Sequence, residues 1–202
     1  VLLKYRGLAE RRILIMTTVN LGQHIHHRYD NELESLRSRV VSMGGLAERQ
    51  ISDALTALGD HNLELAEYVI RTDHRINAQE VNIDEDCTYV LARRQPAAGD
   101  LRMVMSIIKT ITDIERIGDE SEKIARITIR NAEAVAPDMD KIMQQIADMG
   151  LMVRNSLREA LDAFVRMDVN AAVETALRDE EIDNRYVSLL TTLTDHIKEE
   201  PQ

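Results

Sequence analysis

Apolar residues recur at helical spacing along most of the chain. From about His24 to Leu58 they occupy every third or fourth position, which places them on one face of a helix. That face consists of Leu33, Leu36, Val40, Met43, Leu46, Ala47, Ile51, Ala54, Leu55 and Leu58. Gly59-Asp60 interrupts the pattern and ends the first predicted helix.

The same period continues in two further segments. The second predicted helix runs from about Leu63 to Arg94 and is closed by Pro96, because proline disfavours helix in the residue before it. The third starts near residues 97–100 and continues to about Ala134. Three long helices joined by very short connections must fold back on one another. The pattern therefore predicts an antiparallel three-helix bundle.

The second part of the chain repeats the first at a displacement of 106 positions. The matched pairs include Met43-Gly44 with Met149-Gly150, Ala54-Leu55 with Ala160-Leu161, Asp73 with Asp179, and Ile76 with Ile182. One register over two helices indicates an internal duplication, which gives two bundles rather than an array of short repeats. A third helix of the second copy would begin just beyond Gln202.

We therefore expect an all-α protein of two pseudo-repeated antiparallel three-helix bundles, the second lacking its last helix in this chain. The expected division is an N-terminal extension that is either native or an upstream addition (residues 1–22), a first bundle (23–135) and an incomplete second bundle (136–202). A bundle with two helices leaves an apolar groove open. Either the chain is a truncated form, or a partner fills this groove.

Composition and charge narrow the function classes. Aromatic residues make up 3% of the chain, which disfavours a sheet-rich core. The formal net charge of −10 argues against nucleic acid and anionic membranes as main partners, and leaves cations or a basic protein. No apolar stretch is long enough for a membrane span. The single cysteine, Cys87, lies in an apolar helical pattern and is expected to be a buried structural thiol.

Acidic side chains form a stripe on each of two predicted helices. On the second helix the stripe is Asp73, Asn77, Glu80 and Asp84, and on the third it is Glu115, Asp119 and Glu122. Spacings of three and four residues align side chains on one helix face. Like charges at this spacing weaken a helix, and a bound cation with oxygen ligands would relieve them. The alternative is a solvated acidic face, neutralised by the nearby Arg71, Arg75, Arg116 and Lys123.

The residues give little support for a redox site, a histidine metal site or a catalytic site. Histidine is absent from both stripes, so the Glu-x-x-His pairs of di-iron oxidases are missing. The group His24, His26 and His27 is interpreted as a solvated grouping rather than a metal site. No nucleophile with a base and no glycine-rich phosphate loop is found, so we do not expect an enzyme.

Four segments stand out as motifs: residues 43–47 (MGGLA), residues 73–80 (Asp-x-x-Ile-Asn-x-x-Glu), residues 91–102 (LARRQPAAGDLR) and residues 113–119 (DIERIGD). They resemble the PhoU family, the accessory regulators of the phosphate-specific transport system. The last two are the most specific. The resemblance covers about Tyr29 to the C-terminus.

This resemblance implies two pseudo-symmetric three-helix bundles that bind iron or zinc clusters, with magnesium or manganese as alternatives. Glu115 and Asp119 match the family's Glu/Asp-x-x-x-Asp motif, and Asp73, Asn77 and Glu80 match its companion ligands. In the second copy the corresponding residues are Asp179 and Asp183.

The resemblance also implies a function. Such proteins act as negative regulators of phosphate uptake and of the phosphate-starvation response. They couple the nucleotide-binding subunit of a phosphate ABC transporter to a sensor histidine kinase. We accordingly expect a cytoplasmic protein that forms a homodimer. Arg93, Arg94 and Arg102 are either a partner contact or neutralise helix ends and nearby acids.

Two other classes of function stay open at this stage. One is a helical adaptor or scaffold without metal, whose open groove receives a partner helix. The other is a carboxylate-metal enzyme, which the missing histidines disfavour.

Overall fold

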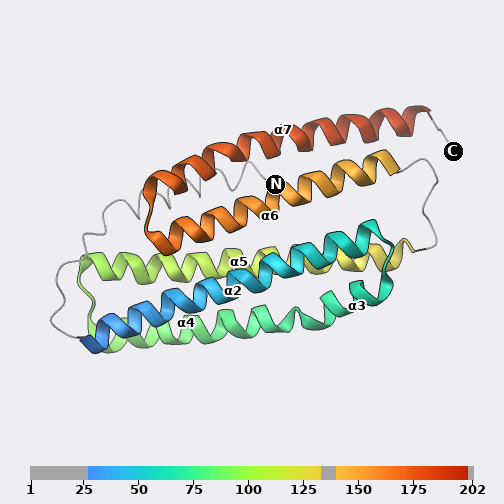
Figure 1. Ribbon diagram of the computed structural model, residues 1–202. Coiled ribbons are helices and arrows are strands. Elements are labelled where there is room, and N and C mark those ends of the chain that lie inside the picture. Colours follow the sequence, from blue (N-terminus) through green and yellow to red (C-terminus); the bar gives the residue numbers. More distant parts are fainter. Residues whose placement is uncertain (1–26, 133–139, 200–202) are drawn as a thin grey trace.

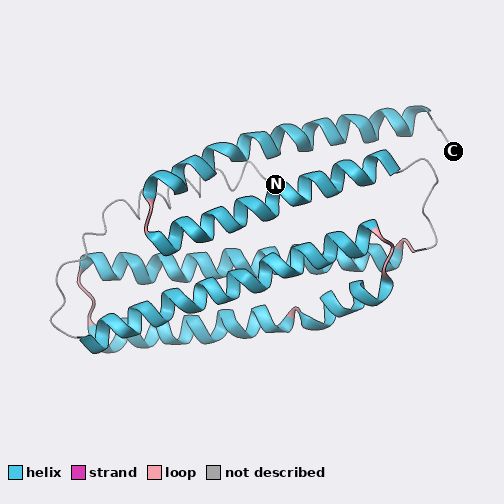
Figure 2. Ribbon diagram, in the orientation of Figure 1, coloured by secondary structure: helices cyan, strands magenta, loops and turns pink. Residues whose placement is uncertain are grey.

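The computed structural model describes residues 27–132 and 140–199, and every regular element in these ranges is a helix (Figures 1 and 2). The elements are α2 (His27–Gly59), α3 (Leu63–Thr72), α4 (His74–Arg94), α5 (Ala98–Arg130), α6 (Asp140–Arg166) and α7 (Val169–Glu199). The all-α prediction is confirmed, and the helix boundaries follow the apolar periodicity closely. None of the described helices is long and apolar enough to cross a bilayer.

The first bundle is built by α2, α3, α4 and α5. Helix α5 packs against the other three, and α2 also contacts both α3 and α4. The core consists mainly of Ile, Val and Met side chains, and the largest of those that are fully buried are Met43, Ile76, Ile83, Ile107 and Ile111. Each such side chain contributes about 1.5–3 kcal/mol relative to an exposed one. Aliphatic packing therefore replaces the aromatic residues that the chain lacks.

The second predicted helix is interrupted, which the sequence interpretation missed. It was expected to be continuous from Leu63 to Arg94, but α3 ends at Thr72 and α4 begins at His74. The Thr72 hydroxyl donates to the Tyr68 carbonyl oxygen at 2.9 Å. Asp73 itself keeps right-handed helical angles (φ −54°, ψ −41°), and its carbonyl accepts from the Ile76 amide at 2.9 Å. The interruption leaves Asp73 between two helical segments.

The expected end of α4 is confirmed by its backbone. Gln95 adopts the left-handed conformation (φ 46°, ψ 61°), and Pro96 follows it. A left-handed residue is a common helix terminator, and proline cannot continue the helix. The turn allows α5 to run back antiparallel to α4.

Helices α6 and α7 form a hairpin attached to the first bundle. In Figure 1, α6 lies between α7 and the bundle, and α6 packs against α2 as well as α7. Leu161 and Phe164 of α6 join the same core cluster as Val40 and Met43 of α2. Among the described helices, α7 contacts α6 alone.

The contact between α2 and α6 is reciprocal. A Cβ atom added to Gly44 of α2 would lie 2.5 Å from Cδ1 of Leu161, and one added to Gly150 of α6 would lie 2.4 Å from Cδ1 of Leu55. Gly44 corresponds to Gly150 and Leu55 to Leu161 in the predicted repeat. Each copy therefore inserts the same leucine against the same glycine of the other copy.

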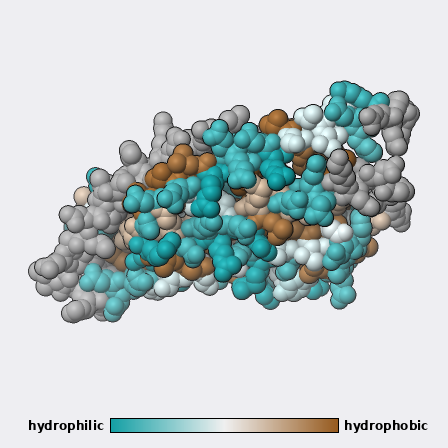
Figure 3. Space-filling view, turned by 45° about the horizontal axis from the view of Figure 1, so that its top comes forward, coloured by the Kyte–Doolittle hydropathy of each residue, from teal (hydrophilic) through white to brown (hydrophobic). Residues whose placement is uncertain are grey.

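The second copy has an open side. Helices α6 and α7 expose several large apolar side chains, among them Leu177 and Ile197, which are 67% and 68% exposed. Figure 3 shows hydrophobic patches that interrupt an otherwise hydrophilic surface. The two-helix arrangement agrees with the expected incomplete second bundle.

Some predictions lie outside the described residues. These are the extension at residues 1–22, the side chains of His24 and His26, and the boundary between residues 135 and 136. His27 is the first residue of α2.

Candidate metal centre

Asp73 is the most buried of the predicted ligands, with 7% of its surface exposed. It lies at the interruption between α3 and α4. Its carboxylate accepts hydrogen bonds from Gln50 Nε2 of α2 at 2.9 Å and from Asn77 Nδ2 of α4 at 3.3 Å. A buried carboxylate requires such donors, because an isolated buried charge is very costly. Asp73 is therefore held in a fixed orientation by two helices.

Gly118 lets α5 approach this carboxylate closely. A Cβ atom at Gly118 would lie 3.3 Å from Asp73 Oδ1 and 3.1 Å from Ile76 Cδ1. Both distances are tight for a Cβ atom, whose ordinary contacts lie at 3.4–4 Å. The absence of a side chain at Gly118 therefore brings Glu115 and Asp119, on the same helix, toward Asp73.

The carboxylates of α4 and α5 interact electrostatically. Burial is the main cause that raises the pKa of the Glu115 carboxyl. The negative charges of Asp119, Glu80 and Asp73 raise this pKa further, whereas Arg116 lowers it. Groups that repel one another in this way share one region of space. The structure thus brings Asp73, Glu80, Glu115 and Asp119 into one acidic neighbourhood.

Asn77 offers a further oxygen atom. Its Nδ2 donates to Asp73, but its Oδ1 is buried and has no hydrogen-bond partner. A buried acceptor without a partner costs about 1–3 kcal/mol. Amide oxygens are ordinary ligands of hard cations. The set of oxygen atoms around Asp73 therefore fits a cation, and a cation would satisfy the unpaired oxygen.

These side chains do not form a closed coordination shell. In residues 27–132 and 140–199, no three His, Cys, Asp or Glu side chains lie close enough to hold one ion together. Two other acids of α5 are oriented toward arginines: Glu122 pairs with Arg126 at 2.5 Å, and Asp113 lies 3.9 Å from Arg116. Metal binding by Asp73, Asn77, Glu80, Glu115 and Asp119 stays a prediction.

The two predicted ligands of the second copy lie apart from this neighbourhood. Asp179 and Asp183 are both partly buried residues of α7. Because α7 contacts only α6 within the described helices, no acidic helix equivalent to α5 faces these two residues there. They also stay predictions.

Gln50 belongs to the site although the sequence interpretation did not include it. It is buried, and it donates to Oδ1 of Asp73, whereas Asn77 donates to Oδ2. A signal was present in the sequence, because Gln50 is a polar residue within the apolar face of the first helix, beside Ile51 and Ala47. A polar residue on a buried face normally has a specific partner.

The structure also shows the contacts of Cys87, Arg93 and Arg94, which the sequence had singled out. Cys87 is buried, and burial raises the pKa of its thiol to about 12, with Asp84 and Asp86 adding to the effect. This confirms the predicted structural thiol. Arg94 pairs with Glu32 of α2 at 2.5 Å, and Arg93 stacks over the Tyr89 ring at 5.1 Å.

Known proteins are similar to this chain in sequence and in fold. The PhoU domain model matches residues 40–128 and 146–202. A phosphate-specific transport system accessory protein PhoU homolog of Pseudomonas putida is 44% identical over 183 residues, which cover 91% of this chain and 71% of the relative. The corresponding PhoU protein of Serratia marcescens is 40% identical, over 92% of this chain and 75% of its own length.

Solved structures give the same result. The crystal structure of PhoU from Pseudomonas aeruginosa superimposes with a TM-score of 0.80 at 42% identity, over 86% of this chain and 82% of the other. The phosphate transport system regulatory protein PhoU from Streptococcus pneumoniae gives a TM-score of 0.78 at 31% identity, over 85% and 80%. Sequence and structure together show that this chain belongs to the PhoU family.

Proposed function

We propose that this chain is an accessory protein of phosphate transport that represses phosphate uptake and the phosphate-starvation response. The proposal depends on family membership, since the relatives are named phosphate-specific transport system accessory proteins. The observation in this chain that carries it is the acidic neighbourhood of Asp73, Glu80, Glu115 and Asp119, which would hold the family's metal.

The metal would have a structural role in this proposal. Iron or zinc is favoured by the family, and magnesium or manganese are alternatives that oxygen ligands also accept. Asp73, Asn77 and Glu80 would hold it from the α3–α4 side, and Glu115 and Asp119 from α5. A bound cation would neutralise the repulsion that raises the Glu115 pKa. It would thereby fix α4 against α5 and stiffen the surface of the first bundle.

Regulation then requires binding surfaces and no chemical step. We infer that the protein works in the cytoplasm, as a homodimer, between the nucleotide-binding subunit of a phosphate ABC transporter and a sensor histidine kinase. A rigid helical bundle suits this role, because binding to a preformed surface loses less conformational entropy.

Metal content tests the site directly. Protein purified from cells should contain iron or zinc by elemental analysis, and Glu115→Gln and Asp119→Asn should each lower the metal-to-protein ratio. Glu120→Gln is the matched control, because Glu120 is exposed and pairs with Lys123 on the same helix. Metal-free wild-type protein, or equal loss in the control, would contradict the metal centre.

Gene deletion tests the regulatory role separately. A deletion strain should express a phosphate-starvation reporter in phosphate-rich medium, and the wild-type gene should restore repression. Normal repression in the deletion strain would refute the regulatory assignment. If the wild-type gene and Asp119→Asn restore repression equally, the metal is not needed for regulation.

A metal-free helical adaptor is the second candidate function. It is favoured by the lack of a closed ligand shell in the described part of the chain and by the exposed apolar residues of α6 and α7. This candidate predicts no bound metal and repression that tolerates Asp119→Asn. The two experiments above therefore separate the two functions.

A further inference from the structure

A cavity of about 300 Å³ lies in the groove between α2 and the α3–α4 segment. Its lining residues are Leu46, Arg49, Gln50, Asp53, Tyr68, Val69, Thr72, Arg75 and Ile76. The charged members come from two helices, Arg49 and Asp53 from α2 and Arg75 from α4. This groove lies beside the metal centre but uses different charged side chains.

Arg49 and Asp53 of α2 interact electrostatically, but the charges in this cavity form no close pair. No hydrogen bond or ion pair is found for Arg49, Asp53 or Arg75 among the described contacts. Burial raises the pKa of Asp53, and the Arg49 guanidinium acts in the opposite direction. The cavity therefore presents two cationic donors and one carboxylate acceptor to a ligand.

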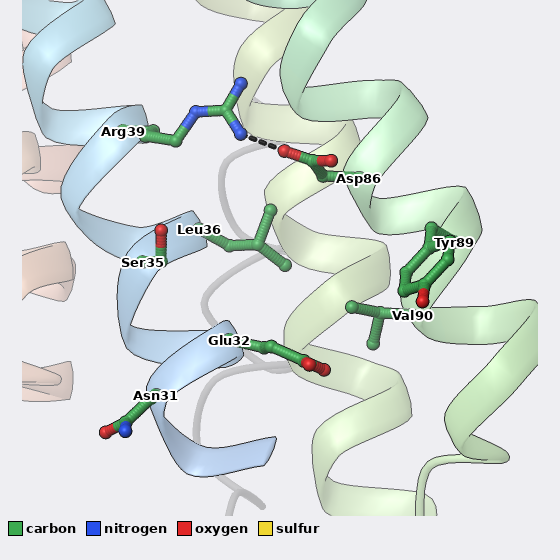
Figure 4. A pocket seen from close by; sticks show the side chains of 8 residues that line it. All are labelled: Asn31, Glu32, Ser35, Leu36, Arg39, Asp86, Tyr89 and Val90. Atoms are coloured by element: carbon green, nitrogen blue, oxygen red, sulfur yellow. Dashed lines mark hydrogen bonds and ion pairs between the residues drawn. The ribbon is translucent and has the colours of Figure 1, made fainter. Parts of the chain in front are cut away.

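A neighbouring cavity in the same groove shows the contrast. Figure 4 shows its lining side chains, which come from the N-terminal part of α2 and the C-terminal part of α4. The volume of this cavity is about 360 Å³. There Arg39 forms an ion pair with Asp86 across the groove. Its main cation is thus already neutralised, which leaves less attraction for an anion.

The second copy provides an internal comparison. The equivalent groove between α6 and α7 holds a cavity of about 350 Å³ in which Met152 corresponds to Leu46 and Ile182 to Ile76. At the position of Arg49 this copy has Asn155, and at that of Arg75 it has Glu181. A groove of similar volume thus persists without an arginine at either of these two positions. It is lined instead by Arg185 and by Arg178, and Arg178 pairs with Glu159, the residue that corresponds to Asp53.

We propose that the Arg49–Asp53–Arg75 cavity binds a phosphate-class oxyanion that keeps a proton. Arginine forks donate several hydrogen bonds to tetrahedral oxyanions. An ionised carboxylate only accepts, so Asp53 requires a donor on the ligand. Hydrogen phosphate carries such a donor, whereas sulfate at neutral pH does not. The choice of phosphate among protonated oxyanions rests on the proposed function in phosphate transport.

Calorimetric titration of the full chain with inorganic phosphate, methyl phosphate and sodium sulfate at equal ionic strength tests this inference. Inorganic phosphate should bind and sulfate should not. Methyl phosphate is mostly an unprotonated dianion at neutral pH, so it should bind no better than sulfate. Binding of methyl phosphate as strong as that of inorganic phosphate would overturn the requirement for a proton on the ligand. Equal binding of sulfate and phosphate, or no binding of either phosphate compound, would overturn it.

Variants locate the binding. Arg49→Gln and Arg75→Gln should each weaken phosphate binding about tenfold or more, because each removes charge-assisted hydrogen bonds. Arg185→Gln is the matched control, since Arg185 lines the equivalent groove of the second copy. Asp53→Asn should let sulfate bind, because an amide donates as well as accepts. Phosphate binding unchanged by both first-copy arginine variants would overturn the assignment.

These outcomes are independent of the regulatory test. Circular dichroism and elemental analysis of each variant show whether the fold and the metal content are kept. Normal repression in the deletion strain together with phosphate binding would reject the proposed function but not this site. Loss of repression in that strain without phosphate binding would reject the site alone.

Discussion

Replacing Gly44 by alanine tests the reciprocal contact between the two copies. The new Cβ atom would lie 2.5, 2.6 and 3.1 Å from Cδ1, Cδ2 and Cγ of Leu161. Since carbon atoms prefer separations of about 3.5–4.0 Å, Leu161 must move within the core that it shares with Val40 and Met43. Overpacking of this kind costs about 1–3 kcal/mol.

The neighbouring glycine gives a matched control. Alanine is favoured over glycine in a helix by about 1 kcal/mol, and this gain applies to both Gly44 and Gly45 of α2. A Cβ atom at Gly45 would meet nothing within 4 Å. Gly45→Ala should therefore stabilise the protein, and Gly44→Ala should be less stable than Gly45→Ala by the cost of the clash, about 1–3 kcal/mol.

Urea denaturation followed by far-ultraviolet circular dichroism measures these differences. Double-mutant cycles test whether the clash is with the expected leucine. Gly44→Ala should lower the free energy of unfolding less in a Leu161→Ala background, and Gly150→Ala should lower it less in a Leu55→Ala background. The crossed pair Gly44→Ala with Leu55→Ala should be additive, because no clash joins these residues. Equal stability of the Gly44 and Gly45 variants, or equal coupling in the crossed pair, would refute the reciprocal packing.

Three further predictions concern polar or ionisable groups that are partly or fully buried. In metal-free protein, Glu115→Gln should raise the urea midpoint of unfolding at neutral pH. The pKa of Glu115 is raised in the folded state, so the ionised carboxylate destabilises the fold at neutral pH. The stability difference between wild type and variant should therefore shrink as the pH falls through that pKa. A wild-type protein that is no less stable than the variant at neutral pH would contradict this. Gln50→Leu should destabilise the fold by about 1–3 kcal/mol, because Asp73 loses its shorter hydrogen bond; unchanged unfolding would show that this bond is dispensable. Cys87 should resist alkylation by iodoacetamide in the native protein at neutral pH and react after unfolding, since its thiol is buried with a pKa of about 12; fast native labelling would disprove its burial.

Most of the fold could be predicted because the apolar periodicity is strong. Residues such as Met43, Ile83 and Ile107 occupy the positions that the pattern assigned to the core, and all three are buried. Long helices with few breaks leave few alternative arrangements. The interruption at Asp73 was not predictable from this pattern, because Asp73 keeps helical dihedral angles (φ −54°, ψ −41°) and the break leaves the apolar period intact.

The acidic site was predictable only in part. Helical spacing aligned Glu115 with Asp119 and Asp73 with Asn77, but spacing within one helix does not show which face meets another helix. The approach of α5 to Asp73 depends on Gly118, and the orientation of Asp73 depends on Gln50. Both are tertiary contacts between residues far apart in the chain.

Comparing the two copies of the repeat shows which residues are needed for helix packing and which are not. Positions that pack alike kept their residues in both copies, as the Gly44–Leu161 and Gly150–Leu55 contacts show. Some charged positions changed, although Asp73 recurs as Asp179: Arg75 of the first copy corresponds to Glu181 of the second. Because the helices of both copies pack in the same way, a residue that differs between the copies is not required for this packing. Its role in the first copy is therefore better sought in what that copy binds than in how it folds.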